Sequence, residues 1–204
     1  MVRNSILVPA AFAVVFVASH VHAAVTVGQK APEFTAKDVS GKTVNLADFK
    51  GKHVVLEWVN PGCPFVRKHY NGGNMQSTQK DAAAKGVVWL AINSTETAHT
   101  DYLDPAKLGA WMKEKSSTVA ATLMDENGSI GKLYGAKTTP HMYIINPQGN
   151  LVYAGGIDSI PSARESDIAK ATNFVKLALA EAAQGKAIST PSTAPYGCSV
   201  KYKS

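Results

Sequence analysis

The sequence predicts an α/β protein in which a central mixed β-sheet is flanked by helices on both faces. Three observations support this fold class. Apolar strand-like runs alternate with helical segments through the first half of the chain, which gives two strand–helix–strand passages. A strong turn sequence at residues 146–150 then joins two further strands as a hairpin. A long helical segment closes the pattern.

The first half opens with an expected N-terminal β-hairpin, in which residues 34–38 and 43–46 flank a turn. An apolar strand then leads into a helix that begins at Pro64 and is interrupted near Gly72. Proline suits the first position of a helix, so Pro105 is expected to begin another. The expected elements after the hairpin are a strand at 53–59, a helix from 64 that resumes at 75–85, a strand at 87–92, a surface excursion at 96–104 and a helix at 105–115.

The second half is expected to contain a short strand, a short helix, the hairpin and one long helix. Apolar residues on the long helix recur at helical spacing, and Gly185 is expected to end it. The expected ranges are 120–124, 130–134, 141–145 with 151–154, and 166–183; the apolar face consists of Ile168, Ala171, Val175, Ala178 and Ala182.

Residues 24–186 are therefore expected to form one domain, and residues 187–204 an extended tail that carries Cys198. The tail contains Pro191 and Pro195, several hydroxyl residues and no hydrophobic periodicity. A length of about 180 residues after the leader suits a single domain with a core of its own.

The first 23 residues are typical of a signal peptide. Arg3 supplies a positive start, an apolar stretch follows, and Ala23 ends a small-residue sequence of the kind that a signal peptidase cleaves. The apolar stretch, about 13 residues long, is short for a membrane-spanning helix, although an uncleaved anchor stays open as an alternative. We expect export to the periplasm or outside the cell, where disulfides persist, and no membrane association after cleavage.

Charge and motifs exclude several function classes. The formal net charge is +6, but the lysines are scattered and do not interleave with aromatic residues, so no nucleic-acid partner is expected. The chain has no glycine-rich phosphate loop, no cysteine set with zinc spacing and no Gly-x-Ser-x-Gly motif, and no cofactor is expected. The oligomeric state is not predicted.

Cys63 is the first candidate for a reactive group. It lies where the apolar strand gives way to the helix, with Pro64 at the first helical position, so Cys63 is the expected cap residue. Its sulfur would then accept hydrogen bonds from the N–H of Phe65 or Val66, and the helix N-terminus favours the thiolate. This position points toward redox chemistry.

Charged residues near Cys63 have two interpretations. Arg67 lies one helical turn further on and either adds positive charge near the sulfur or is solvated at the surface. Lys68 and His69 are expected at the surface, away from the sulfur. Four acids are expected in solvated loops and turns: Asp101, Asp104, Asp125 and Glu126.

Three motifs carry a family resemblance: Trp58-Val-Asn-Pro-Gly-Cys63-Pro, Thr138-Thr-Pro140 before a strand, and the turn-and-strand sequence at 146–153. With these motifs, the chain resembles the thioredoxin-like superfamily over roughly residues 28–185. It is most similar to the redoxin branch, the alkyl hydroperoxide reductase/thiol-specific antioxidant family with its peroxiredoxin-like members. The resemblance implies a thioredoxin-like fold and thiol-dependent redox activity.

The active-site residues depart from both patterns that the resemblance implies. Thioredoxins have a second cysteine three residues before the one at Cys63, where this chain has Asn60. Peroxiredoxins have a threonine at that position and a proline four residues earlier, where this chain has Leu56. A local two-cysteine cycle is therefore excluded, and a typical peroxidase is not expected.

The resemblance also implies that Thr139–Pro140 is a cis peptide whose loop faces Cys63 and aligns substrate backbone or keeps metals away. The imidazole of His141 would then approach Cys63, where it could lower the pKa of the thiol, relay a proton or bind a metal. The alternative for His141 is a half-buried strand residue that bonds to backbone.

Cys198 has three possible roles. With two thiols in an exported chain, a Cys63–Cys198 disulfide is the default expectation. That disulfide is either a structural staple or a redox-active pair in which the tail brings a resolving thiol. The third alternative is two independent thiols.

The favoured hypothesis is an exported thiol-dependent oxidoreductase. Cys63 attacks a hydroperoxide or a disulfide, Cys198 resolves the product as a distal thiol, and an exported thiol reductant resets the pair. One rival is a copper-binding protein or metallochaperone that uses Cys63 and His141, with or without Cys198. The other rival is a non-catalytic binding module that a disulfide stabilises.

Overall fold

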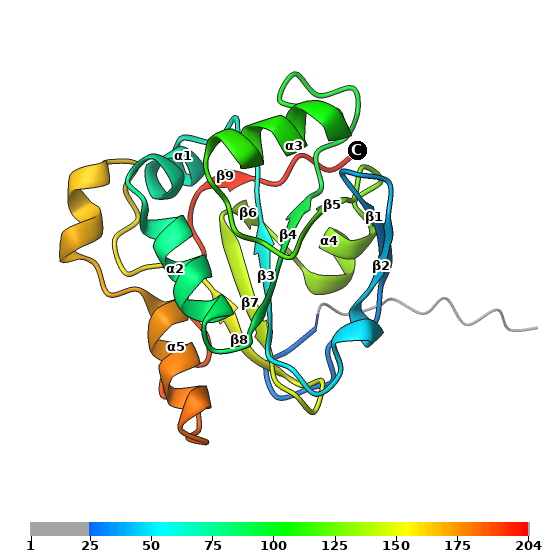
Figure 1. Cartoon of the computed structure of the whole chain (residues 1–204). Coiled ribbons are helices and arrows are strands. Elements are labelled where there is room, and N and C mark those ends of the chain that lie inside the picture. Colours follow the sequence, from blue (N-terminus) through cyan, green and yellow to red (C-terminus); the bar gives the residue numbers. More distant parts are fainter. Residues whose placement is uncertain (1–24, 204) are drawn as a thin grey trace, which may run out of the picture.

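The computed structural model describes residues 25–203, so the expected signal peptide at 1–23 lies outside the described residues. A seven-stranded sheet forms the centre, in the order β2-β1-β5-β4-β3-β7-β8 (Figure 1). Its strands are β1 (Thr35–Asp38), β2 (Thr43–Asn45), β3 (Val54–Trp58), β4 (Val88–Asn93), β5 (Ala121–Met124), β7 (His141–Ile145) and β8 (Leu151–Gly155). Two further short strands, β6 (Thr138–Thr139) and β9 (Cys198–Ser199), pair with each other.

The sheet is mixed, as the alternation of strands and helices predicts. Strands β3, β4 and β5 run parallel, because helical segments connect them as crossovers. The hairpins at both ends of the sheet add antiparallel strands: β1 pairs with β5, and β7 pairs with β3. The predicted strands are confirmed within a residue or two at each end.

Helices cover both faces of the sheet. Side chains of α1, α2, α3 and α5 pack on one face, and α4 packs on the other together with the 3₁₀ helix η1 (Figure 1). The bounds are η1 (Leu46–Phe49), α1 (Pro64–Asn71), α2 (Asn74–Ala83), α3 (Pro105–Glu114), α4 (Ser129–Tyr134), η2 (Glu165–Lys170) and α5 (Phe174–Ala183). Within the described residues, no helix has the length and apolar character that a membrane crossing requires.

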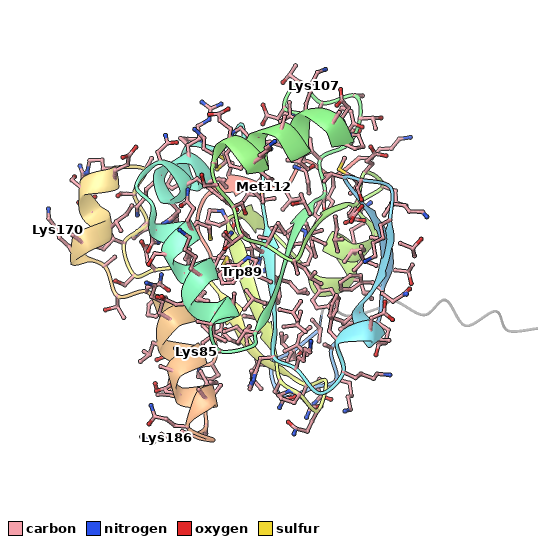
Figure 2. All side chains as sticks on the ribbon, in the orientation of Figure 1. Lys85, Trp89, Lys107, Met112, Lys170 and Lys186 are labelled. Atoms are coloured by element: carbon pink, nitrogen blue, oxygen red, sulfur yellow. The ribbon has the colours of Figure 1, made fainter. Side chains whose placement is uncertain are left out.

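Strand β3 supplies side chains to both cores, since successive residues of a strand point to opposite faces. Val55 and Val59 belong to the core under α1 and α2, whereas Leu56 and Trp58 belong to the core on the α4 side. Figure 2 shows Trp89 and Met112 inside the molecule, while Lys85, Lys107, Lys170 and Lys186 lie at its periphery. Those peripheral lysines agree with the expected solvated surface.

One carboxyl is buried at the centre of the sheet. Glu57 of β3 is completely buried and accepts hydrogen bonds from Tyr70, Gln79 and Trp89, at 2.9, 3.3 and 2.8 Å respectively. Burial raises the pKa of Glu57 to about 7, and the hydrogen bonds oppose this shift. Residues of β3, β4, α1 and α2 thus converge on a single polar group beneath the helices.

The prediction of one continuous helix at 166–183 is wrong. This segment is divided into the 3₁₀ helix η2 and the helix α5, and Ala171 between them is extended. The Asn173 side chain accepts the N–H of Lys176 at 2.9 Å and so begins α5 as a cap. The Asn173 amide also donates to Thr78 of α2 at 3.0 Å, a contact that periodicity does not reveal. Gly185 ends α5 with φ of +68°, as expected.

Asp125 also differs from its prediction as a solvated acid, because it is 3 % exposed. Its carboxylate accepts the N–H groups of Ile130 and Gly131 at the start of α4, and the Ser94 hydroxyl at 2.6 Å. The Ser94 hydroxyl in turn accepts the Trp58 indole N–H at 3.0 Å. This carboxylate therefore fastens α4 to strands β3 and β4.

The C-terminal tail is extended and packs along the domain (Figure 1). Ser192 forms a parallel bridge with Ala154 of β8, and Thr193 donates and accepts hydrogen bonds beside Gly155. The chain then continues past α1 to β9 and ends beside α4, where the Tyr202 hydroxyl donates to the Ala136 carbonyl at 2.8 Å. The tail thus brings Cys198 back to the domain.

Candidate active site

Cys63 lies where β3 leads into α1. It is the N-cap residue of α1, with extended backbone at φ −79° and ψ 123°, and Pro64 occupies the first turn. The Arg67 N–H donates to the Cys63 carbonyl at 3.0 Å, which begins the helical ladder. This placement confirms the predicted strand-to-helix junction.

The sulfur of Cys63 does not cap the helix, contrary to expectation. Cys63 is 1 % exposed, and its Sγ turns instead toward the loop before β7, where the thiol donates to the Thr139 carbonyl at 3.0 Å. The thiol prefers this acceptor because a buried S–H needs a partner, and the helix N–H groups cannot accept a hydrogen bond.

Cys198 meets Cys63 sulfur to sulfur. The two Sγ atoms are 2.7 Å apart, although the residues are 135 positions apart in the chain, and both are free thiols. The backbone N–H of Cys198 also points at the Cys63 sulfur, at 3.4 Å. Burial, and then the neighbouring Cys63 sulfur, raise the pKa of Cys198 to about 12. Cys198 therefore keeps its proton at neutral pH in the dithiol state.

A two-residue antiparallel pairing fixes this contact. Cys198 of β9 lies opposite Thr139 of β6, and Ser199 lies opposite Thr138. The Thr139–Pro140 peptide is cis, as the family resemblance implies. Gly197 precedes the pair with φ of +131°, and a Cβ there would lie 2.1 Å from the Thr139 carbonyl oxygen. The tail can thus follow this path only with glycine at position 197.

Asn60 holds the loop before Cys63. Its Oδ1 accepts the Gly62 N–H at 2.7 Å, and its Nδ2 donates to Asp101 at 3.3 Å. A Cβ at Gly62 would lie 2.8 Å from the Asp101 Cγ, so a side chain there would require the Asp101 carboxylate to move. The Asn60 amide therefore holds the loop through its oxygen, which accepts from Gly62, and holds Asp101 beside the loop through its nitrogen.

Arg67 is exposed, and its Nε donates to the Pro61 carbonyl at 2.7 Å. This bond closes the loop from Pro61 back onto the second turn of α1. Of the two interpretations of Arg67, the structure matches a surface arginine that braces the loop.

Lys68 and His69 are buried, so their predicted surface positions are wrong. Their side chains are both 0 % exposed, and both face Asp158, whose side chain is 2 % exposed. Lys68 Nζ lies 3.3 Å from the Asp158 carboxylate and also donates to the Ile160 carbonyl at 3.2 Å. The Tyr196 hydroxyl of the tail donates to the same carboxylate. Asp158 and Tyr196 of the tail, both distant in the sequence, thus cover Lys68 and His69 of α1.

His69 connects this cluster to α2. Its Nδ1 accepts from the Asn74 amide at 2.8 Å, so its Nε2 carries the proton and donates to the Tyr196 oxygen at 3.1 Å. Burial lowers the pKa of His69 to about 4, against the opposing effect of Asp158. The ring is therefore neutral at pH 7. The spacing of Val66, His69 and Tyr70 on one helical face is the sequence signal that could have predicted the burial of His69.

His141 does not face Cys63. Its neighbours Met142 and Ile144 point into the core that contains Cys63, so His141 and Tyr143 point to the opposite face. There the His141 Nδ1 accepts the Lys137 N–H at 3.2 Å, and the ring packs against the Tyr143 ring at a tilt of 41°, with centroids 4.5 Å apart. Burial lowers its pKa to about 4. His141 therefore matches the alternative of a strand histidine bonded to backbone.

The copper hypothesis needs Cys63 and His141 on one side of the sheet, and they lie on opposite sides. Among residues 25–203, no group of three or more histidine, cysteine or acidic side chains is placed to hold a metal ion. Cys63 and His141 are therefore not brought together as a ligand pair within residues 25–203.

The mixed sheet, the cysteine at the start of α1 and the cis-proline loop against its sulfur define a protein of the thioredoxin-like class. Residues 27–154 match the family model described as "AhpC/TSA family". The chain belongs to this family.

Comparison with known proteins supports the same thioredoxin-like class. The chain is 28% identical over 126 residues to the thiol-disulfide oxidoreductase ResA of Bacillus subtilis; the match covers 61% of this chain and 64% of that protein. A crystal structure of an uncharacterized conserved protein from Geobacillus kaustophilus is similar at a TM-score of 0.74 and 27% identity, over 87% of this chain and 93% of that one. The thioredoxin domain of a Bacteroides vulgatus thiol-disulfide oxidoreductase shares the fold at a TM-score of 0.52 and 22% identity, over 72% and 98%.

Proposed function

We propose that this protein is a thiol–disulfide oxidoreductase that reduces disulfides, with Cys63 as the nucleophile and Cys198 as the resolving thiol. The observation that carries the proposal is the contact of the two Sγ atoms at 2.7 Å, with Cys198 held on β9 opposite Thr139 of β6. The similarity to ResA, a thiol-disulfide oxidoreductase, supports the same reaction class. Because that match spans 64% of ResA, the substrates of this chain are part of the proposal.

The chemistry is two successive exchanges. The Cys63 thiolate attacks one sulfur of a substrate disulfide, the substrate S–S bond breaks, and the departing sulfur takes up a proton. Cys198 then loses its proton and attacks the Cys63 sulfur of the mixed disulfide, which forms the Cys63–Cys198 bond and releases the second substrate thiol. The two cysteines supply the two electrons, and an exported dithiol returns them.

The electrostatics favour Cys198 as the second attacking thiol. The pKa of Cys198 is raised to about 12, so Cys198 keeps its proton while Cys63 makes the first attack. Part of that rise comes from the Cys63 sulfur itself. When Cys63 is tied up in a mixed disulfide it carries no charge, so the pKa of Cys198 falls and the second attack becomes easier.

Peroxide reduction is less well supported as the primary activity. Neither Asn60 nor Arg67 directs its side chain at the Cys63 sulfur, since both bond to the loop. A peroxide would therefore find no side-chain donor from these two residues beside the thiolate.

The test uses a disulfide-bonded peptide and a dithiol reductant. Cys63→Ser is expected to abolish reduction of the peptide, and Cys198→Ser to accumulate a mixed disulfide on Cys63 that mass spectrometry detects. Ser199→Ala is the matched control, because it changes the neighbouring residue of β9 and keeps both thiols. Full turnover by Cys198→Ser without a trapped species would remove the resolving role.

Two further outcomes separate the alternatives. A reduction potential for the Cys63–Cys198 disulfide below about −300 mV would indicate a structural staple. Rapid formation of sulfenic acid on Cys63 in Cys198→Ser treated with hydrogen peroxide, without reduction of the peptide, would replace disulfide exchange with peroxidase activity.

A further inference from the structure

Cys63 is reachable only when the tail moves. Its 1 % exposed fraction reflects cover by the tail, since Cys198 lies on its sulfur and Gly197 lies against Thr139. The second exchange step needs the opposite arrangement, with Cys198 back in contact. One equilibrium, between a docked and a released tail, therefore governs both substrate access and resolution.

A polar anchor of the tail near Cys198 is Tyr196, two residues before it. The Tyr196 hydroxyl donates to Asp158 and accepts from His69, inside the cluster that also contains Lys68. The Tyr196 ring packs edge-on against Phe65 with centroids 5.8 Å apart, and Lys68 Nζ lies 5.7 Å from its centroid. Phe65, Lys68 and His69 all belong to α1, the helix that Cys63 begins.

The anchor is well suited to hold the tail at a fixed distance from the nucleophile. The hydroxyl bonds to a buried carboxylate, and a hydrogen bond to a charged group is worth more than one between neutral groups. Release of Tyr196 would also leave Asp158 and His69 with one partner fewer in a buried site. Docking of this residue therefore stabilises the docked tail.

The surroundings leave room for release. A cavity of about 290 Å³ lies beside the anchor and is lined by residues of both the tail and the domain, among them Asp158, Phe174, Thr193 and Tyr196. The tail between Thr193 and Tyr196 therefore borders this cavity on one side and the domain on the other.

We propose that Tyr196 is a positioning residue, whose hydroxyl holds the tail in the Lys68–His69–Asp158 cluster and so sets how often Cys198 lies on Cys63. This inference rests on the proposed function, in which Cys198 resolves the mixed disulfide. Lys68, His69 and Asp158 do not touch either sulfur, but they take part in the reaction by holding Tyr196.

The first test is the equilibrium of the protein with reduced and oxidised glutathione. Tyr196→Phe keeps the ring and removes the hydroxyl, and is expected to lower the equilibrium constant for the Cys63–Cys198 disulfide about tenfold or more. Tyr134→Phe is the matched control: its hydroxyl donates to the Pro32 carbonyl at 2.7 Å on the other face of the sheet, and its constant should equal that of wild type. An unchanged constant in Tyr196→Phe would overturn the proposal.

The second test measures access to Cys63 without any disulfide. In the Cys198→Ser background, alkylation of Cys63 by iodoacetamide is expected to be about tenfold faster with Tyr196→Phe than with Tyr196. Phe65→Leu removes the ring contact and leaves the buried charges in place, so a smaller acceleration is expected, and this variant keeps the test available if Tyr196→Phe folds poorly. Equal alkylation rates in all three proteins would overturn the proposal.

The two tests separate this inference from the proposed function. If wild type forms no disulfide with glutathione, the resolving role of Cys198 fails, while the alkylation rates still report the hold of Tyr196 on the tail. If the disulfide forms equally well with and without the hydroxyl, the exchange mechanism stands and the role of Tyr196 fails.

Discussion

Cys63 and Cys198 meet sulfur to sulfur, but the segments that deliver them are built in different ways. Around Cys63, the flanking side chains Val59, Val66 and Tyr70 are at most 2 % exposed and belong to the main core. Around Cys198, Tyr196 and Tyr202 are only half-buried, and each reaches the domain through a hydroxyl group. One thiol is thus fixed in the scaffold, whereas the other arrives on a strand of two residues.

This difference suits two-step exchange. A nucleophile needs a constant environment, because attack on a substrate depends on a fixed position of its sulfur. A resolving thiol needs to leave while the substrate binds and to return afterwards. Burial of apolar side chains supplies the first property, and a small number of hydrogen bonds supplies the second.

The stability of the domain that holds Cys63 should depend on pH through Glu57. The pKa of Glu57 is about 7 in the folded chain, against an ordinary value of 4.5, so the folded state keeps this proton to a higher pH than the unfolded state. Protonation of Glu57 therefore adds roughly 3 kcal/mol to the free energy of unfolding below about pH 4.5, and this contribution is lost as the pH rises to about 7.

Glu57→Gln removes this titration. The free energy of unfolding of the variant minus that of wild type is expected to rise by roughly 3 kcal/mol between pH 4 and pH 8, measured by urea unfolding. Other groups that titrate in both proteins cancel in the difference. Glu114→Gln, at an exposed position on α3, is the control and should give a flat difference. A flat difference for Glu57→Gln would show that the buried carboxyl is not protonated near neutral pH.

Gly197→Ala should disrupt the docking of the tail that carries Cys198. A side chain at φ +131° and 2.1 Å from the Thr139 oxygen forces the tail off β6, so the equilibrium constant for the Cys63–Cys198 disulfide should fall about 30-fold, or about 2 kcal/mol. Gly185→Ala, at the end of α5 with φ of +68° and no atom within 4 Å of the added Cβ, is the matched control. It should reduce overall stability and leave the disulfide constant as in wild type.

Tyr202→Phe gives the smallest expected effect. Its hydroxyl donates to the Ala136 carbonyl, a neutral acceptor, at 2.8 Å. Loss of one neutral hydrogen bond should lower the disulfide constant roughly fivefold, or about 1 kcal/mol, in the same glutathione titration. A larger effect than that of Tyr196→Phe would place the main hold on the tail after Cys198 instead of before it.

Sequence periodicity predicts the scaffold better than the site. The strands and α1 to α4 follow from apolar runs, prolines and glycines, which are local signals. Lys68 and His69 are buried against Asp158, about ninety positions away, and the long helix is divided before Asn173, which contacts α2. No local pattern contains these partners.

The case of His141 shows the same limit within a single strand. Alternation along β7 indicates that His141 and Tyr143 share a face, but which face holds Cys63 is decided by the side of the sheet on which α1 packs. The pairing of Cys63 with Cys198 is the default expectation from the sequence, because only two thiols are present. The β6–β9 register that brings them together depends on the path of the whole tail.

The pairing of β6 with β9 has a consequence for molecules that meet at high concentration. Each strand is an edge whose complement is carried by every other copy of the chain, so a departed tail can be exchanged between two molecules with the same register. Mild oxidation would then link the Cys198 of one molecule to the Cys63 of another. The share of covalent dimer on a non-reducing gel should climb with protein concentration, and a share independent of concentration would show that each tail returns only to its own sheet.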